Sequence, residues 1–169
     1  NLIQIRTEGQ NGKQIVKDFF YDEKGRVRAE SLPRFESVSI NLSTSLVQNQ
    51  TNYTFDSLDR VIRVLNPDLT MKNISFDLLN VTVYDENSHR TKYLLDSFDR
   101  IQSVIEYNSD YDSGIVSQGV YLTNYSYNLV DELIQIEDSL GNKFNFTYDS
   151  LGRKTGMHDP DIGVWNYSY

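Results

Sequence analysis

The feature that most constrains this chain is a short motif that recurs along it. Each copy reads Asn-aromatic-Ser/Thr-aromatic-Asp, followed by two residues and then Gly-Arg, and the cleanest copy is 145–153. Because internal repetition outranks length as a guide to architecture, the fold must be one that accommodates a series of copies. Looser copies span 19–26, 52–60, 93–100 and 124–132, and a sixth begins at Asn166.

The first half of each copy predicts a β-strand. In the cleanest copy, Phe146 and Tyr148 alternate with Asn145 and Thr147. Alternation with a period of two places the rings on one face of a strand and the polar pair on the other. We expect the rings to pack inward as the core, and Trp165 to join them by the same alternation.

The second half of each copy predicts a tight turn. An Asp such as Asp149 can begin the turn by accepting a hydrogen bond from the backbone two residues later. Gly152 can then take the positive φ of a type I turn closed by a bulge. Where this Gly is replaced, the substitute is Asp59, Asp99 or Asp131, and Asp is among the few residues that tolerate that conformation. Each copy therefore predicts one β-hairpin.

These copies resemble the YD repeat, also called the Rhs repeat, whose consensus is aromatic-x-Tyr-Asp-x-x-Gly-Arg-hydrophobic. The second turn of that family is matched at 65–68 and 158–163, and the resemblance weakens over 33–47 and over the insert 108–119. The family includes Rhs and insecticidal toxin-complex shells, teneurins and surface-associated bacterial and archaeal proteins. The resemblance implies a spiralling antiparallel sheet, which in the shells winds into a hollow cocoon.

The expected fold is all-β, an array of stacked antiparallel hairpins in the form of a YD/Rhs-repeat spiral or fibre, with no helices. Val, Ile, Tyr, Phe and Thr dominate, as strands prefer. A strand is also expected over 35–47, where apolar and polar residues alternate. We expect residues 1–169 to form a single array that is cut within repeats at both ends, since 2–5 resembles the return strand 133–136 and the sixth copy stops at Tyr169.

Composition excludes several classes of function. The net charge is −8, with 16 basic against 24 acidic residues, which argues against a nucleic-acid partner. The absence of Cys rules out a disulfide scaffold and zinc bound through Cys. No apolar run approaches about 18 residues, so no membrane insertion is expected.

The sequence carries a series of N-glycosylation acceptor patterns, Asn-x-Ser/Thr. Repeats copy themselves and polar strand faces favour Asn and Thr, so the series can arise without any glycan. Against that, alternation places the Asn on the face opposite the rings, where an attached glycan has room. We therefore predict N-linked glycans on some of the eight: Asn41, Asn49, Asn52, Asn73, Asn80, Asn124, Asn145 and Asn166.

Two other features are candidates for metal binding. Asn108, Asp110 and Asp112 place oxygen ligands at alternate positions, as in a calcium loop, but the Gly comes one place late and the late bidentate Glu is missing. We interpret this segment as a solvated acidic loop. His89 and His158 are expected in turns without a partner Cys or a second nearby His, so no metal site is predicted there.

The recurring charged residues favour structure over catalysis. No Ser lies in a nucleophile-elbow context, and paired carboxylates such as Asp159 and Asp161 suit turns better than acid–base chemistry. An Arg recurs after each turn and is expected to bridge acidic turn residues of neighbouring hairpins through charge-assisted hydrogen bonds. These are Arg26, Arg60, Arg100 and Arg153.

Three functions are compatible with this pattern, and none is enzymatic. The first is an extracellular structural protein: a glycosylated surface fibre, stalk or layer, with no cofactor other than glycans. Its partners would be neighbouring repeats or other copies joined end to end. The second is a fragment of a toxin-encapsulating shell. The third is an adhesin or glycan-binding module, in which the aromatic series would form a platform for sugars.

Overall fold

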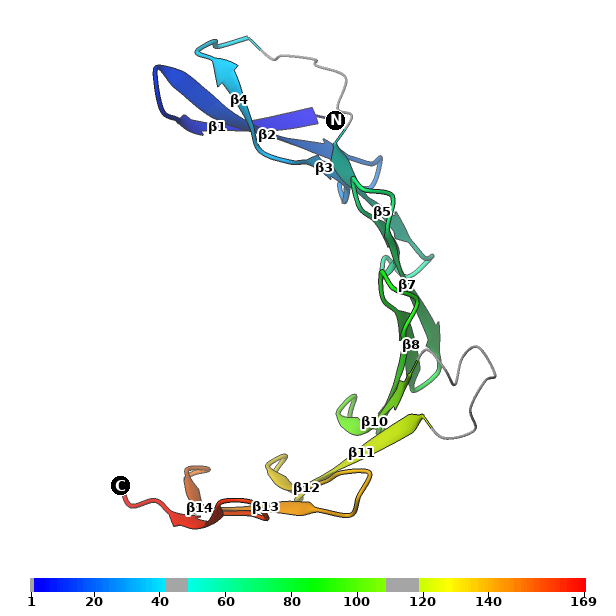
Figure 1. Ribbon diagram of the computed structural model, residues 1–169, viewed down its shortest axis with the longest axis vertical. Helices are drawn as coiled ribbons and strands as arrows, with labels where there is room; N and C mark the ends of the chain where they lie inside the picture. Colours follow the sequence, from blue (N-terminus) through cyan, green and yellow to red (C-terminus); the bar gives the residue numbers. More distant parts are fainter. Residues whose placement is uncertain (1, 42–48, 109–118) are drawn as a thin grey trace. The chain divides into compact units, whose positions relative to one another are not determined.

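Every regular element in the computed structural model is a β-strand, over the residues it describes: 2–41, 49–108 and 119–169 (Figure 1). The strands pair antiparallel in the order β1-β2-β3-β5 and then consecutively to β15, while β4 pairs with β2 beside β3. This confirms the all-β array of hairpins. The strands are β1 (Leu2–Glu8), β2 (Lys13–Tyr21), β3 (Val27–Ser31), β4 (Arg34–Ser37), β5 (Gln50–Phe55), β6 (Val61–Leu65), β7 (Met71–Asp77), β8 (Asn80–Tyr84), β9 (Arg90–Leu95), β10 (Ile101–Tyr107), β11 (Val120–Tyr127), β12 (Leu133–Glu137), β13 (Lys143–Tyr148), β14 (Lys154–Asp159) and β15 (Gly163–Asn166).

The chain divides into two compact units. The first comprises Asn1–Ile74 and Asp85–Asn87, and it contains the hairpins β2–β3 and β5–β6. The second comprises Ser75–Tyr84 and Ser88–Tyr169, and it contains β9–β10, β11–β12 and β13–β14. These five hairpins, numbered first to fifth below, correspond to the five copies of the motif.

All five predicted turns form as expected. In the first hairpin, the Gly25 N–H donates to the Asp22 carbonyl at 3.2 Å, and the Asp22 N–H donates to the Arg26 carbonyl at 2.9 Å. The strand register then shifts between Phe20 and Tyr21, as a bulge requires. Positive φ falls at the predicted position of every turn: Gly25, Asp59, Asp99, Asp131 and Gly152.

The Asp at the start of each turn orders the backbone with one oxygen. The Asp22 Oδ1 atom accepts hydrogen bonds from the Lys24 and Arg26 N–H groups, both at 2.9 Å. The fourth hairpin carries Asn128 instead, and its amide oxygen accepts the same two bonds. The turn thus needs an oxygen at this position rather than a charge.

Within each of the two units, the described residues form a sheet that is one layer thick. Extensive contacts between elements join only strands that are neighbours in the sheet. Val16 and Ala29 are the only buried hydrophobic side chains among the described residues, and the Tyr148 ring of the cleanest copy is half-buried. The prediction that Trp165 lies in a core is wrong, because its side chain is 50% exposed. Alternation placed the rings on one face, but no second layer within the described residues covers that face.

A small polar cluster holds β4 against β2. Asp18 is buried, and its carboxylate accepts a hydrogen bond from Arg34 at 2.5 Å. The predicted strand over 35–47 is correct only as far as Ser37, where β4 ends. Residues 38–41 are not part of a strand, and side chains of other residues bond to their backbone. The Arg6 guanidinium, for example, donates to the Ser39 carbonyl at 2.6 Å. Residues 42–48 lie outside the described part.

The first prediction tests whether the first turn requires positive φ at Gly25, a position where an added Cβ atom would not clash with other parts of the chain. A Cβ atom added at Gly25 would have no heavy atom within 4 Å apart from those of its chain neighbours, and φ there is +80°. Gly25→Val should therefore lower the free energy of unfolding by about 1–3 kcal/mol, because a β-branched residue resists positive φ. Gly25→Asn should cost clearly less, since Asn tolerates that conformation. Urea unfolding of both variants measures the difference, and equal losses would contradict the turn assignment.

Candidate functional site

The repeated site of this chain is the contact that Arg makes beside each turn. In the first hairpin, Arg26 Nε donates to Asp22 Oδ2 at 2.7 Å, and the terminal nitrogen lies 2.6 Å from the same oxygen. The recurring Arg therefore pairs first within its own hairpin rather than across to a neighbour. The same pairing, at 2.6–2.7 Å, recurs at Arg60–Asp56, Arg100–Asp96 and Arg153–Asp149.

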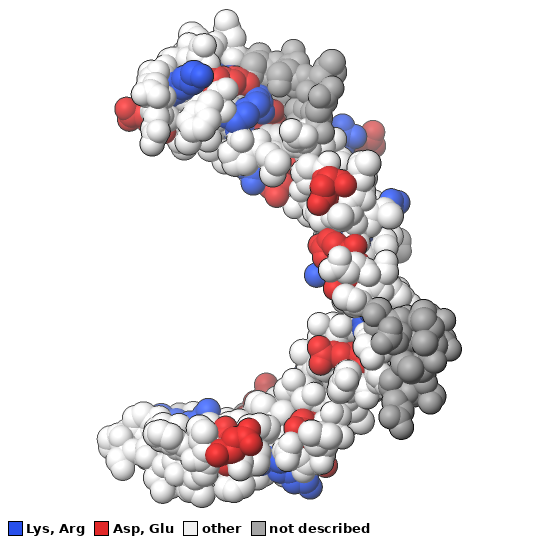
Figure 2. Space-filling view, viewed as in Figure 1, with Lys and Arg blue, Asp and Glu red and all other residues white. Residues whose placement is uncertain are grey.

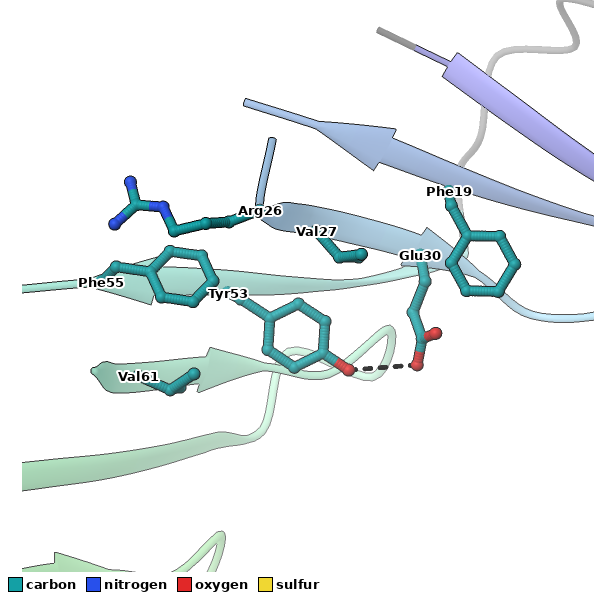
Figure 3. Close-up of a pocket in the computed structure, with 7 residues that line it drawn as sticks. All are labelled: Phe19, Arg26, Val27, Glu30, Tyr53, Phe55 and Val61. Carbon is teal, nitrogen blue, oxygen red and sulfur yellow. Dashed lines mark hydrogen bonds between the residues drawn. The ribbon is translucent and has the colours of Figure 1, made fainter. Parts of the chain in front are cut away.

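The same Arg also reaches the next hairpin. The Arg26 guanidinium lies over the Phe55 ring, 4.3 Å from its centroid (Figure 3). It also bonds to the carboxylate of Asp59. Lys24 adds a second cation 3.0 Å from Asp59. Planar stacking on a ring with paired donors at its edge is a geometry that suits Arg better than Lys. We call the Arg, the ring and the Asp at positive φ the inter-repeat contact.

The second unit contains the same inter-repeat contact between the third and fourth hairpins. Arg100 lies over the Tyr127 ring at 4.6 Å and donates to Asp131 Oδ1 at 2.8 Å. Arg153 likewise lies 4.8 Å from the centroid of the Tyr169 ring. The expectation that Arg residues bridge neighbouring hairpins is therefore correct for Arg26 and Arg100, in addition to the pairing within each hairpin.

A tyrosine hydroxyl joins one repeat to the backbone of the preceding one in three places. Each hydroxyl donates to a backbone carbonyl in the preceding hairpin. The acceptor is the first residue of that hairpin's second strand. This bond joins a side chain of one hairpin to the backbone of another, so it fixes their spacing. The pairs are Tyr127 to Ile101 at 3.0 Å, Tyr148 to Leu133 at 2.8 Å and Tyr169 to Lys154 at 3.0 Å.

The Arg beside each turn is held by charge as well as by shape. The Arg26 backbone N–H, followed by its guanidinium, lowers the pKa of Asp22 below the ordinary value of an Asp. The Arg153 side chain lowers the pKa of Asp149 in the same way. The pKa of Arg100 is raised by its hydrogen bonds to Asp96 and Asp131. These groups are largely solvated, so their main effect is on geometry and register.

A shallow groove of about 370 Å³ lies beside the first inter-repeat contact (Figure 3). Its polar groups pair with one another: the Tyr53 hydroxyl donates to Glu30 at 3.0 Å, and Lys17 lies 2.9 Å from the same carboxylate. The Lys17 hydrogen bond lowers the pKa of Glu30, while burial and Glu30 raise that of Tyr53. The groove is lined by Phe19, Arg26, Val27, Glu30, Tyr53, Phe55 and Val61.

The predicted glycosylation sites lie on strands and loops of different exposure. Asn73 in β7 and Asn166 at the end of β15 are exposed, as are Asn41 and Asn49 outside the strands. Asn52, Asn80, Asn124 and Asn145 are half-buried. Three amide oxygens accept hydrogen bonds on the face opposite the rings: Asn52 from Gln50 at 2.9 Å, Asn124 from Ser103 at 2.7 Å and Asn145 from Gln135 at 2.8 Å.

The candidate metal ligands are only partly described. Asn108 follows β10, whereas Asp110 and Asp112 lie outside the described residues. His89 is in a turn as expected, but His158 lies within β14. Across 2–41, 49–108 and 119–169, no group of three His, Cys, Asp or Glu residues could hold a metal ion.

On the face that Figure 2 shows, charge is spread rather than gathered into a basic patch. Figure 2 shows acidic and basic groups side by side on the face in view. No helix in the described part of the chain is long and apolar enough to cross a membrane.

The sequence predicted that an Arg would meet an acidic turn residue of a neighbouring hairpin, but it did not identify that residue as Asp59 or Asp131. Asp59 and Asp131 were explained by their tolerance of positive φ, which accounts for them without a partner. The use of Asp rather than Asn at this position was the available indication of a cationic partner. The tyrosine hydroxyls were missed because strand alternation predicts a face and not a hydrogen bond.

The second prediction concerns the second hairpin, which has a Phe where the fourth hairpin has the bonding tyrosine. Phe55 occupies the position of Tyr127, and the groove beside it includes Val27, the equivalent of Ile101. Phe55→Tyr should add a hydrogen bond to the Val27 carbonyl and raise the free energy of unfolding by about 0.5–1.5 kcal/mol. Tyr127→Phe is the matched control and should lose a similar amount. Urea midpoints that do not move in opposite directions would contradict this role.

The third prediction concerns acid. The pKa of Asp22, Asp96 and Asp149 is lowered by folding, so their stabilisation is complete above the unfolded value of about 4 and is lost as pH falls through the folded values. Urea midpoints should therefore fall more steeply between pH 5 and 2 in the natural chain than in a variant with all three changed to Asn. Asn128 shows that an amide preserves the turn. Parallel pH profiles would contradict the prediction.

Comparison with known proteins identifies the family. The Teneurin YD-shell family matches residues 2–169. Among solved structures, TcdB2-TccC3 is similar at 17% identity with a TM-score of 0.70, over 97% of this chain and 10% of that chain. A form without the hypervariable C-terminal region has 15% identity and a TM-score of 0.76, over 96% and 9%.

A third similar structure is a mutant Tc holotoxin pore of Photorhabdus luminescens, at 15% identity with a TM-score of 0.59, over 100% of this chain and 11% of that chain. The chain thus spans about a tenth of the length of these structures, and at such identities the likeness shows the fold alone. The comparison with curated proteins gives no match. The family match over nearly every residue, together with the repeated turn and its Arg, shows that this chain belongs to the Teneurin YD-shell family.

Proposed function

We propose that this chain is a section of the wall of a larger extracellular YD-shell, with a structural and non-enzymatic role. The observation that carries the proposal is the inter-repeat contact, in which the side chains that shape one turn also fasten the next hairpin. A protein built this way extends by adding hairpins and needs no separate core.

The open faces of the sheet support a role within a larger assembly. Large apolar side chains on strands, such as Ile3 in β1, Tyr121 in β11 and Trp165 in β15, are at least half exposed. The Tc structures with the same fold are about ten times longer than this chain, which is the size expected if many such sections combine. Neighbouring repeats, of the same or another chain, are the partners that this architecture favours.

The fourth prediction tests the wall directly. Electron microscopy of the natural protein that carries this segment should show closed hollow particles in which these hairpins form part of the wall. Antibody fragments raised against the turn at 149–153 provide the control, since they should decorate the particles from one side. Unbranched filaments built from this segment would contradict the shell.

A second candidate is a glycosylated surface fibre. The observation that favours it is the exposure of Asn73 and Asn166, both in acceptor patterns and on the face opposite the rings. Glycans on such a face would hydrate the sheet and hinder lateral association.

The fifth prediction tests the glycans. When the chain is secreted from a eukaryotic host, enzymatic release of N-glycans should lower its mass, with occupancy at Asn73 and Asn166 exceeding that at half-buried Asn124. Ser75→Ala and Ser168→Ala are the matched controls, because each removes an acceptor pattern and leaves the Asn in place. An unchanged mass would exclude the glycosylated fibre and leave the shell intact.

A further inference from the structure

The fourth and fifth hairpins meet without the Arg that joins other pairs. Glu132 stands where Arg26 and Arg100 stand in the first and third hairpins. Within its own turn, Glu132 accepts a hydrogen bond from the Asn128 side-chain amide at 2.6 Å. A carboxylate at residue 128 would instead place two negative charges together. The reversal of charge at residue 132 is therefore matched by a neutral residue at 128.

Glu132 also faces the next hairpin, as the Arg residues do. A Cβ atom built on Gly152 would lie 3.5 Å from Glu132 Oε1, and no other heavy atom would lie within 4 Å. Gly152 occupies the turn position of Asp59 and Asp131, which bond to Arg26 and Arg100. A carboxylate introduced at this position would lie close to that of Glu132.

We propose that residue 152 is a specificity-determining position, and that the charge at this turn position is matched to the residue after the preceding turn. Where the preceding hairpin carries Arg, the next hairpin carries Asp at this turn position, as at Asp59 and Asp131. Where the preceding hairpin carries Glu132, the next hairpin carries Gly152. Hairpins are then not interchangeable: one that carries Asp fits behind an Arg and is repelled behind Glu132. This inference does not depend on whether the array closes into a shell.

The competing explanation is that Gly152 is present only because Gly adopts positive φ easily. Asn and Asp both tolerate that conformation and have nearly the same shape, so comparing the two variants isolates charge. The experiment therefore uses Gly152→Asp and Gly152→Asn in the full chain, each in the natural background and in an Asn128→Asp/Glu132→Arg background.

In the natural background, the urea midpoint of Gly152→Asp should lie about 0.1–0.5 M below that of Gly152→Asn at low salt. In the Asn128→Asp/Glu132→Arg background, the order should reverse, because the carboxylate introduced by Gly152→Asp would then have an Arg partner, as Asp131 has. The difference should shrink in both backgrounds at about 1 M salt, where the Debye length is only about 3 Å.

A third background, Glu132→Gln, keeps the proposal testable if the Asn128→Asp/Glu132→Arg change disturbs folding. Glu132→Gln removes the charge and retains an oxygen that can accept from Asn128. The difference between Gly152→Asp and Gly152→Asn should then fall to zero. An Asp–Asn difference of the same sign and size in the natural and Glu132→Gln backgrounds would overturn the proposal.

Discussion

The structure depends on one side chain at the start of each hairpin turn, which is a carboxylate in every hairpin except the fourth, where Asn128 takes its place. One oxygen of Asp22 accepts two backbone N–H groups and so fixes the turn, while the other holds Arg26. The held Arg lies flat over Phe55 and reaches Asp59 in the next hairpin. Local backbone geometry and the spacing between hairpins are thus set by the same side chain. A short sequence motif can therefore specify an extended architecture, because a copy such as that of Arg26 or Arg100 carries both its own turn and its attachment to the next hairpin.

The turns and strands were predictable because their physics is local. Alternation of rings with Asn and Thr, followed by Asp and a residue that tolerates positive φ, predicts hairpins at 56–59 and 149–152 without knowledge of the rest of the chain. Where context decides, the same reasoning was wrong. Alternation continues through Val38 and Ile40, but Arg6 and Gln14 bind backbone carbonyls nearby and the strand ends at Ser37. Trp165 alternates like a core residue, yet a period of two cannot tell whether a face is covered.

The candidate site was only half predictable for a related reason. The recurrence of Arg at one position indicated an ion pair, and the structure shows two, one within the hairpin and one beyond it. The partner beyond it, Asp59, had already been explained by its backbone conformation, which concealed its second role. Tyr127 was assigned to the ring face, although its hydroxyl bonds to the backbone of the preceding hairpin. When one role of a residue is evident from the sequence, a second role of the same residue is easily overlooked.

The neighbour-only pairing of the strands has a consequence for how the chain folds. Extensive contacts in the described part join strands adjacent in the sheet, and most of these strands are also adjacent in sequence. Such contacts close short loops, so little chain entropy is lost before each contact forms. Folding can therefore begin at any hairpin and spread outward, as in other linear arrays. By the same logic, a damaged hairpin would break the array into two independently folded stretches, and partial unfolding would start there.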